Sequence, residues 1–170
     1  VYPYDKLCSQ VLGLTDIDEN GLGGIESSLN QVISGSNGFK VVEKDGRQHQ
    51  FSTLKEETVS AKYGDSVFLT IDCNIQSIVE EELEKACLKW NPDSAIAIAM
   101  DPSTGEVLAM ANYPTFNPNF VRDSNLEQRR NRAITDCFEP GSLIKPLIIS
   151  DALENGLVEE DETIFCYNGA

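Results

Sequence analysis

The clearest pattern in the chain is a helical one that runs from about Asn74 to Trp90. Apolar residues recur there at the spacing of one helix face, while glutamates and lysines occupy the opposite face. The apolar positions are Ile75, Ile78, Val79, Leu83, Ala86, Cys87 and Trp90. Asp72 or Asn74 can cap the start of this helix, and Asn91-Pro92 ends it. The pattern predicts an amphipathic helix whose apolar face, Cys87 and Trp90 included, is buried.

Two apolar segments after this helix predict a β-hairpin. They are residues 95–100 and 106–111, and the turn sequence 101–105 separates them. Gly105 stands where the turn requires left-handed backbone. The small alanines in both segments favour close packing against a helix, and the long amphipathic helix is the candidate. A short apolar run at residues 67–71 predicts one further strand.

The beginning of the chain predicts a smaller module of mixed structure. Residues 7–14 suit a buried strand or a short helix, and residues 25–33 suit a helix after a glycine-rich turn. Residues 39–43 and 48–54 predict the two strands of a hairpin that turns at Lys44-Asp45-Gly46-Arg47.

A domain boundary is expected at Tyr63-Gly64-Asp65, so that residues 1–64 and 65–170 form separate parts. Residues 122–132 are polar and are expected at the surface. The elements together predict a mixed α+β fold, in which helices pack on an antiparallel sheet after a small N-terminal module.

The charge balance excludes several kinds of partner. There are 13 basic and 28 acidic residues, which give a net charge of -15. Such a surface repels nucleic-acid phosphates and anionic membranes, so nucleic-acid binding is not expected. No apolar run approaches the roughly 20 residues of a membrane span, and no signal peptide opens the chain. Because the chain starts abruptly at Val1 and ends abruptly at Ala170, we expect a piece of a longer protein.

Cysteine and histidine usage gives no sign of a metal site or cofactor. There is one histidine, His49, on a predicted hairpin strand, and there is no C-x-x-C pair. The five cysteines are Cys8, Cys73, Cys87, Cys137 and Cys166. Cys137 and Cys166 flank the segment described next and can pair, although buried free thiols are the ordinary alternative.

Residues 138–146, Phe-Glu-Pro-Gly-Ser-Leu-Ile-Lys-Pro, contain a candidate nucleophile and base. Pro140-Gly141 predicts the start of a new helix, with Ser142 in its first turn and Lys145 three residues later on the same face. A serine there lies beside unpaired backbone N–H groups and the positive end of the helix dipole. Lys145 can accept a proton only if burial or a nearby cation lowers its pKa from the usual value of about 10.4.

The S-x-x-K spacing alone is weak evidence for a catalytic serine and its base. Residues 52–55, Ser-Thr-Leu-Lys, have the same spacing without the Pro-Gly lead-in, and we treat that copy as coincidental. Ser142 can also be read as an N-cap without any chemical role, since serine is a leading N-cap residue. Local sequence leaves both readings of Ser142 open.

Several segments, in order along the chain, resemble the class B penicillin-binding proteins, the D,D-transpeptidases that cross-link peptidoglycan. The first two resemble the non-catalytic pedestal of that family, and the others resemble the opening of its transpeptidase domain, the first hairpin and the approach to the nucleophile. The matching segments are residues 2–13, 21–26, 69–76, 99–111, 131–133 and 138–146. The last of them contains the S-x-x-K box of penicillin-recognising enzymes.

The resemblance implies that Ser142 is the acylated nucleophile and Lys145 its general base, with no cofactor or metal. The implied substrate is a peptidoglycan stem peptide ending in D-Ala-D-Ala, and β-lactams would acylate the same serine. Residues 1–64 would be the pedestal, able to contact cell-wall synthesis proteins, and residues 65–170 the first part of the transpeptidase domain. The parent protein would lie on the outer face of the bacterial cytoplasmic membrane, held by an N-terminal anchor that these residues lack.

The chain departs from the family pattern after Ser142. The 28 residues that follow contain neither an S-x-N nor a K-T-G triplet, and Ser28-Leu29-Asn30 matches S-x-N only by chance. We therefore expect the site to be incomplete within this chain, and the chain alone to be acylated weakly or not at all. Two other readings are a β-lactam-recognising relative, such as a β-lactamase or sensor, and a non-catalytic scaffold. The pedestal-like residues 1–64 argue against a simple β-lactamase.

Overall fold

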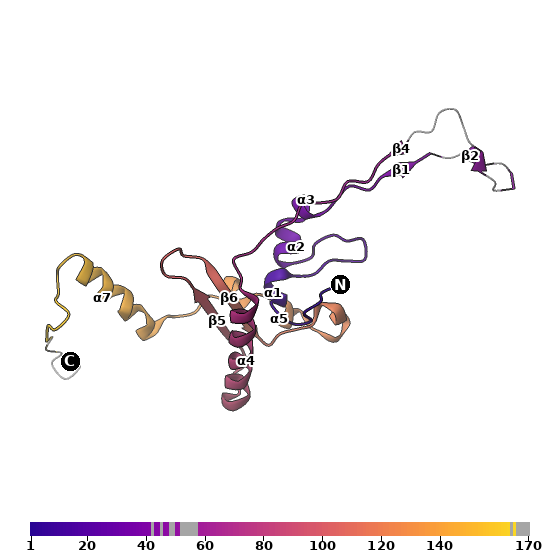
Figure 1. Ribbon diagram of the computed structural model, residues 1–170. Coiled ribbons are helices and arrows are strands. Elements are labelled where there is room, and N and C mark those ends of the chain that lie inside the picture. Colours follow the sequence, from indigo (N-terminus) through magenta and orange to yellow (C-terminus); the bar gives the residue numbers. More distant parts are fainter. Residues whose placement is uncertain (42, 45, 48–49, 52–57, 164, 166–170) are drawn as a thin grey trace. The chain divides into compact units, whose positions relative to one another are not determined.

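The computed structural model describes most of the chain as two compact units. The described residues are 1–41, 43–44, 46–47, 50–51, 58–163 and 165. The first unit is Val1–Thr135 and the second is Asp136–Ala170, and each is considered separately below (Figure 1). Across the described part of the chain, no helix is long and apolar enough to cross a membrane. The expected division into residues 1–64 and 65–170 stays a prediction.

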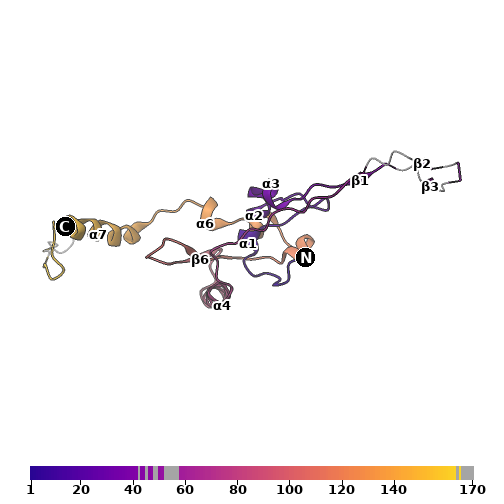
Figure 2. The same cartoon turned by 45° about the horizontal axis from the view of Figure 1, so that its top comes forward.

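The first unit is built around helix α4, Cys73–Trp90, which packs on a two-stranded sheet (Figures 1 and 2). Strands β5, Ala95–Met100, and β6, Val107–Tyr113, pair antiparallel, and Gly105 in the turn has a φ of +78°. Ala109 and Ala111 of β6 are fully buried, which allows the helix to approach the sheet closely. The predicted helix, hairpin and contact between them are confirmed.

The buried face of α4 differs in part from the predicted apolar face. Cys87 is buried as predicted, but Trp90 is 73% exposed and Ile78 is 62% exposed. Trp90 lies in the last turn, where its ring contacts the Lys89 amine at 4.8 Å. Gln76 is fully buried instead, because its side-chain amide bonds the backbone of β6. The prediction of a buried apolar face is therefore wrong at Trp90 and at Ile78.

Residues 67–71 do not form the predicted strand. The C-terminal end of this segment is bonded to the start of β6, where the Thr70 hydroxyl donates to Val107 O at 2.6 Å. The next contact is from the Asp72 N–H to Leu108 O at 2.9 Å. These two bonds are too few for a ladder, and Phe68 remains 94% exposed.

The predicted short helices near the N-terminus are present. Helix α1 is Ser9–Leu12, and the predicted helix at residues 25–33 consists of α2, Gly24–Ser28, and α3, Asn30–Ile33. Cys8, Ser9 and Gln10 at the start of α1 are buried.

The predicted hairpin at residues 39–54 is confirmed only near its turn. Strands β2, Glu43–Lys44, and β3, Gln50–Phe51, pair antiparallel. Strand β1, Phe39–Lys40, pairs instead with β4, Thr58–Val59, and a bridge between Ser36 and Lys62 joins the same two arms farther from the turn. His49 and residues 52–55 lie outside the described residues.

The predicted surface segment at residues 122–132 is partly buried. It contains the end of the 3₁₀ turn η1, Pro118–Asp123, the helix α5, Leu126–Arg129, and the start of α6, Arg132–Thr135. The Arg129 guanidinium donates to the carbonyl oxygens of Val121 and Ser124, at 2.6 Å in each case. The Arg132 side chain is only 14% exposed. The surface prediction is therefore wrong for these two arginines, since backbone carbonyl groups accept from Arg129 and the Glu127 carboxylate pairs with Arg132 at 2.9 Å.

The second unit contains the 3₁₀ turn η2, Gly141–Ile144, and helix α7, Lys145–Glu154. The helix ends at Asn155, and Gly156 follows with a φ of +65°. This is the helix whose start Pro140-Gly141 predicts. Helices together with antiparallel strands confirm the predicted mixed α+β class.

Candidate active site

Ser142 and Lys145 lie one turn apart at the start of the second unit's helix. Residues Gly141–Ile144 form a 3₁₀ turn that continues directly into α7. The Lys145 backbone N–H donates to Ser142 O, which closes the turn between the two residues. Because a 3₁₀ helix has three residues per turn, residues i and i+3 lie one above the other. The two side chains therefore leave the helix on the same face.

Pro140 and Gly141 start this turn in the way that the sequence indicates. Pro140 has a φ of -67° and a ψ of -23°, and its carbonyl accepts from the Leu143 N–H at 2.9 Å. Gly141 has a φ of +53°, in the left-handed region that glycine adopts without strain. The chain therefore turns sharply immediately before Ser142.

The structure gives Ser142 no capping role. Pro140 is the N-cap of η2 and Ile144 is the N-cap of α7, and neither helix start has a side-chain capping bond. Both Ser142 and Lys145 are exposed. Within the described ranges, neither the Ser142 hydroxyl nor the Lys145 amine makes a hydrogen bond to another group. The hydroxyl is thus left available for chemistry, which favours the nucleophile reading over the N-cap reading.

Exposed apolar side chains surround these two residues on the helix. They are Leu143, Ile144, Leu147, Ile148, Ile149 and Leu153, with exposed fractions between 38% and 70%. They lie on several sides of α7, which is typical of a helix that is buried in the interior of a protein. The amine of Lys145 thus emerges from an apolar surface at the positive end of a helix dipole.

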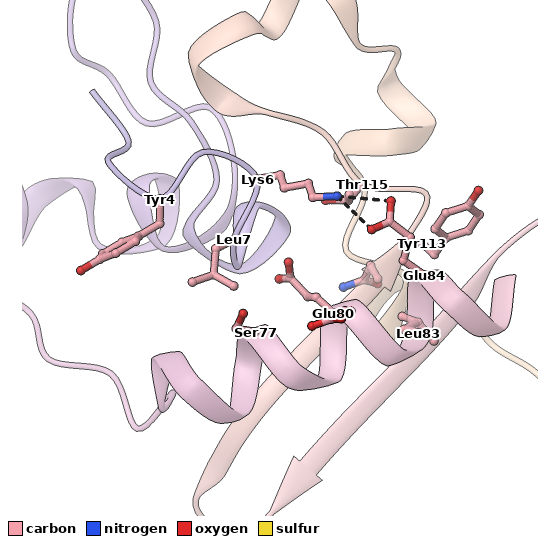
Figure 3. A pocket seen from close by; sticks show the side chains of 11 residues that line it. Tyr4, Lys6, Leu7, Ser77, Glu80, Leu83, Glu84, Tyr113 and Thr115 are labelled. Carbon is pink, nitrogen blue, oxygen red and sulfur yellow. Dashed lines mark hydrogen bonds and ion pairs between the residues drawn. The ribbon is translucent and has the colours of Figure 1, made fainter. Parts of the chain in front are cut away.

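The first unit contains a separate cavity of about 390 Å³ that sequence reasoning did not predict. It lies where the N-terminal segment meets α4, and its lining includes Leu7, Glu80, Glu84 and Tyr113 (Figure 3). Figure 3 shows the Lys6 amine directed at the Glu84 carboxylate, at 3.1 Å. None of the predicted catalytic residues lines this cavity.

Gln76 and Glu80 form a buried network that the sequence analysis missed. The Gln76 amide donates to Met110 O at 3.1 Å and to Glu80 Oε1 at 2.7 Å, and its oxygen accepts from the Met110 N–H at 2.8 Å. Glu80 Oε1 also accepts from the Cys8 N–H at 2.7 Å. A signal was present in the spacing, since Gln76 lies in helical register with Leu83 and Cys87. The network joins the N-terminal segment, α4 and β6.

A metal centre is not evident in the described part of the chain, where no group of three or more His, Cys, Asp and Glu side chains could hold an ion.

A family model for the penicillin binding protein transpeptidase domain matches residues 95–170. The matched region includes the hairpin of β5 and β6 and the whole of η2 and α7. Ser142 and Lys145 therefore lie within the matched region.

Several curated relatives align with almost the whole chain. A peptidoglycan D,D-transpeptidase FtsI of Buchnera aphidicola is 36% identical over 163 residues, which are 96% of this chain and 28% of the relative. A probable peptidoglycan D,D-transpeptidase PenA of Neisseria meningitidis is 39% identical over 164 residues, again 96% of this chain and 28% of the relative. The chain thus spans about 28% of the length of these relatives.

Solved structures of penicillin-binding proteins also align with almost the whole chain. Penicillin binding protein 2X of Streptococcus thermophilus has a TM-score of 0.76 at 25% identity, over 96% of this chain and 26% of that chain. Penicillin binding protein 3 of Mycobacterium tuberculosis, complexed with aztreonam, has a TM-score of 0.74 at 31% identity, over 96% of this chain and 33% of that chain. The fold of the aligned residues is therefore that of penicillin-binding proteins.

Proposed function

We propose that this chain, which belongs to the penicillin-binding protein transpeptidases, carries the serine that becomes acylated during peptidoglycan cross-linking. The observation that carries the proposal is the turn at Gly141–Lys145. In this turn Ser142 and Lys145 share one face, and the serine hydroxyl makes no capping bond. The family match supports the proposal because it spans the same turn.

In the proposed reaction, the Ser142 hydroxyl attacks the carbonyl carbon of the penultimate residue of a stem peptide ending in D-Ala-D-Ala. Lys145, as a neutral amine, takes the hydroxyl proton as the new C–O bond forms. The proton then goes to the departing amine, and terminal D-Ala leaves. The amine of a second stem peptide attacks the acyl-enzyme, which forms the cross-link and frees Ser142.

The start of α7 supplies one electrostatic element of this reaction. The first N–H groups of a helix have no intrahelical acceptor, and the Ser142 N–H is among them. It can donate to the oxyanion that develops on the attacked carbonyl oxygen. We expect the second donor to come from parts of the longer protein that these residues do not include.

The same helix explains how Lys145 can become a base. An ammonium at the positive end of a helix dipole is disfavoured, and burial disfavours it further. The apolar side chains of α7 are exposed here, so water reaches the Lys145 amine. We propose that the rest of the protein covers α7 and excludes this water from the Lys145 amine.

The ligand, the partner proteins and the location that we propose are inferred from the relatives. Penicillin binding protein 3 of M. tuberculosis has been solved with aztreonam and with ampicillin, and we propose that β-lactams likewise acylate Ser142. Residues 1–64 would form a pedestal able to contact cell-wall synthesis proteins. The protein would act on the outer face of the cytoplasmic membrane, where peptidoglycan is assembled.

Labelling with a fluorescent penicillin tests the proposal in a longer protein that contains these residues. We expect Ser142→Ala to abolish covalent labelling and Lys145→Met to slow it by a factor of about 100 or more, the usual range for loss of a general base. Ser52→Ala is the matched control, because Ser52 and Lys55 have the same spacing, and it should label normally. Undiminished labelling of Ser142→Ala would refute the proposal.

Two further measurements separate the alternatives. Bound label that persists for many minutes indicates a transpeptidase, whereas rapid hydrolysis indicates a β-lactamase. The 170-residue chain alone should label weakly. Strong Ser142-dependent labelling of the chain alone would show that it holds a complete acylation site.

A further inference from the structure

The N-terminal segment runs antiparallel to helix α4. The Lys6 amine pairs with Glu84 at 3.1 Å (Figure 3). Two residues later, the Cys8 N–H donates to Glu80 Oε1 at 2.7 Å. The contacts thus move along α4 toward its N-terminus as the segment advances. The next turns of the helix in that direction lead to Cys73, its first residue.

Cys8 and Cys73 line the same cavity, although the sequence separates them widely. The cavity measures about 250 Å³ and is mostly apolar. Its lining also includes Tyr2, Tyr4, Asp5, Leu12 and Phe68. All of them belong to the first unit. Both thiols are free in the structure, with Cys8 buried and Cys73 exposed.

The surroundings of Cys8 show that its thiol is close to other acidic groups. The pKa of Cys8 is raised to about 12, first by burial, then by the negative charge of Glu80 and then by the charge of a Cys73 thiolate. The other titratable groups at the cavity are Tyr2, Tyr4 and Asp5 of the same segment. The contribution of Cys73 accompanies the geometric observation that both cysteines line one cavity of about 250 Å³.

We propose that Cys8 and Cys73 are a disulfide-forming pair, which under oxidising conditions ties the N-terminal segment covalently to the first turn of α4. The oxidant is a disulfide, either glutathione disulfide or a protein disulfide. The exposed Cys73 thiolate attacks one oxidant sulfur and releases one thiolate, which takes up a proton. The Cys8 thiolate then attacks the Cys73 sulfur and releases the second thiol. Two protein thiols become one disulfide, and the oxidant disulfide becomes two thiols.

Peptide mapping tests this pairing in the 170-residue chain. After incubation with glutathione disulfide and quenching with acid and a thiol-blocking reagent, mass spectrometry should find one linked peptide pair that contains Cys8 and Cys73. The link should be absent from Cys8→Ser and Cys73→Ser. It should persist in Cys87→Ser, whose cysteine is buried on the same helix. The oxidised chain should melt several degrees higher than the reduced chain, because the bond constrains a long loop in the unfolded state.

The pH dependence gives a second test that does not rely on a cysteine variant. A thiol with a pKa near 12 is almost fully protonated at neutral pH, so closure by Cys8 is the slow step. Glutathione-modified Cys73 should accumulate, and the closing rate should rise about tenfold per pH unit between about pH 7 and 9. Glu80→Gln should speed closure several-fold, because it removes the largest charge that opposes Cys8 ionisation. Glu82→Gln is the control and should leave the rate unchanged.

Two results would overturn the proposal. One is a glutathione adduct on Cys73 that does not close even at pH 9. The other is a link in which Cys8 or Cys73 pairs with a different cysteine, such as Cys137.

Discussion

Helix α4 begins with a capped first turn, whereas α7 begins with an uncapped one. The Asp72 carboxylate accepts from the Asn74 N–H at 2.8 Å and from the Ile75 N–H at 3.0 Å. At α7 the chain enters through a 3₁₀ turn, and no side chain bonds the first N–H groups. The cap uses the donors of α4 to stabilise that helix. In the η2 turn that leads into α7, no side chain caps the Ser142 N–H, and an oxyanion site requires such a donor.

The two helices also differ in how they meet their surroundings. Helix α4 buries Gln76 and Cys87 against the hairpin, and its outer face carries Lys85 paired with Glu81 at 2.7 Å and with Glu82 at 2.8 Å. Helix α7 exposes apolar side chains on several sides. Helix α4 packs against other elements of its own unit. Helix α7 has the apolar surface of a helix that is buried in the interior of a protein. Under the proposed function, stability and chemistry therefore reside in different helices.

The largest effect is expected from Gln76→Ala. The substitution leaves the N–H and C=O of Met110 and the Glu80 carboxylate without their buried partner. We expect the free energy of unfolding of the first unit to fall by about 2–4 kcal/mol, as measured by urea unfolding and circular dichroism. Gln31→Ala, at an exposed glutamine, should change it little. Equal effects would show that α4 does not depend on this network.

A smaller loss is expected from Asp72→Ala, which removes the cap of α4. The free energy of unfolding should fall by about 1 kcal/mol, because two N–H groups lose their acceptor. Asp72→Asn should retain most of the stability, since an asparagine side chain also caps. An alanine variant as stable as the parent chain would remove the contrast between the two helix starts.

Ser142→Ala should change the free energy of unfolding by less than about 0.5 kcal/mol, because Ser142 makes no capping bond. This is the counterpart of Asp72→Ala on the other helix, and the two variants can be measured in the same unfolding assay. A loss as large as that for Asp72→Ala would mean that Ser142 caps its helix after all.

The smallest effect concerns the outer face of α4. A hydrogen bond and the charge of Lys85 lower the pKa of Glu81, so this pair contributes stability above the unfolded pKa of about 4.3. That contribution is lost as the pH falls through the lower folded pKa. In Lys85→Met the pKa of Glu81 should rise toward its ordinary value, which NMR titration of the carboxyl carbon measures. Lys89→Met should leave the Glu81 titration unchanged, since Lys89 lies over Trp90.

Sequence reasoning succeeded where the structure depends on neighbours along the chain. The helix at Cys73–Trp90 and the hairpin at residues 95–113 follow from periodicity, capping and turn residues. It failed where distant segments decide the outcome. The pairing of Phe39–Lys40 with Thr58–Val59 depends on strand register, and the exposure of Trp90 depends on tertiary packing that periodicity does not report.

The candidate site was only partly accessible to the same reasoning. The spacing of Ser142 and Lys145 predicts that both lie on one face, and the observed turn confirms that arrangement. Spacing could not separate a nucleophile from an N-cap, because both occupy the first turn of a helix. The absence of a side-chain capping bond at η2 and α7 argues against the N-cap reading, and the nucleophile reading stays a proposal. Gln76 was missed because an apolar pattern does not reveal a buried amide.

The Gln76 amide also determines the direction in which the sheet can grow. It bonds both the N–H and the C=O of Met110, so it stands where the peptide group of a neighbouring strand would stand. The Asp72 N–H donates a hydrogen bond to Leu108 O on the same side of β6. Helix α4 thus closes this edge of the sheet to strand addition, the event that makes exposed edges prone to aggregation. Any further strand therefore has to pair with β5, because Gln76 occupies the hydrogen-bonding groups of Met110 at the edge of β6.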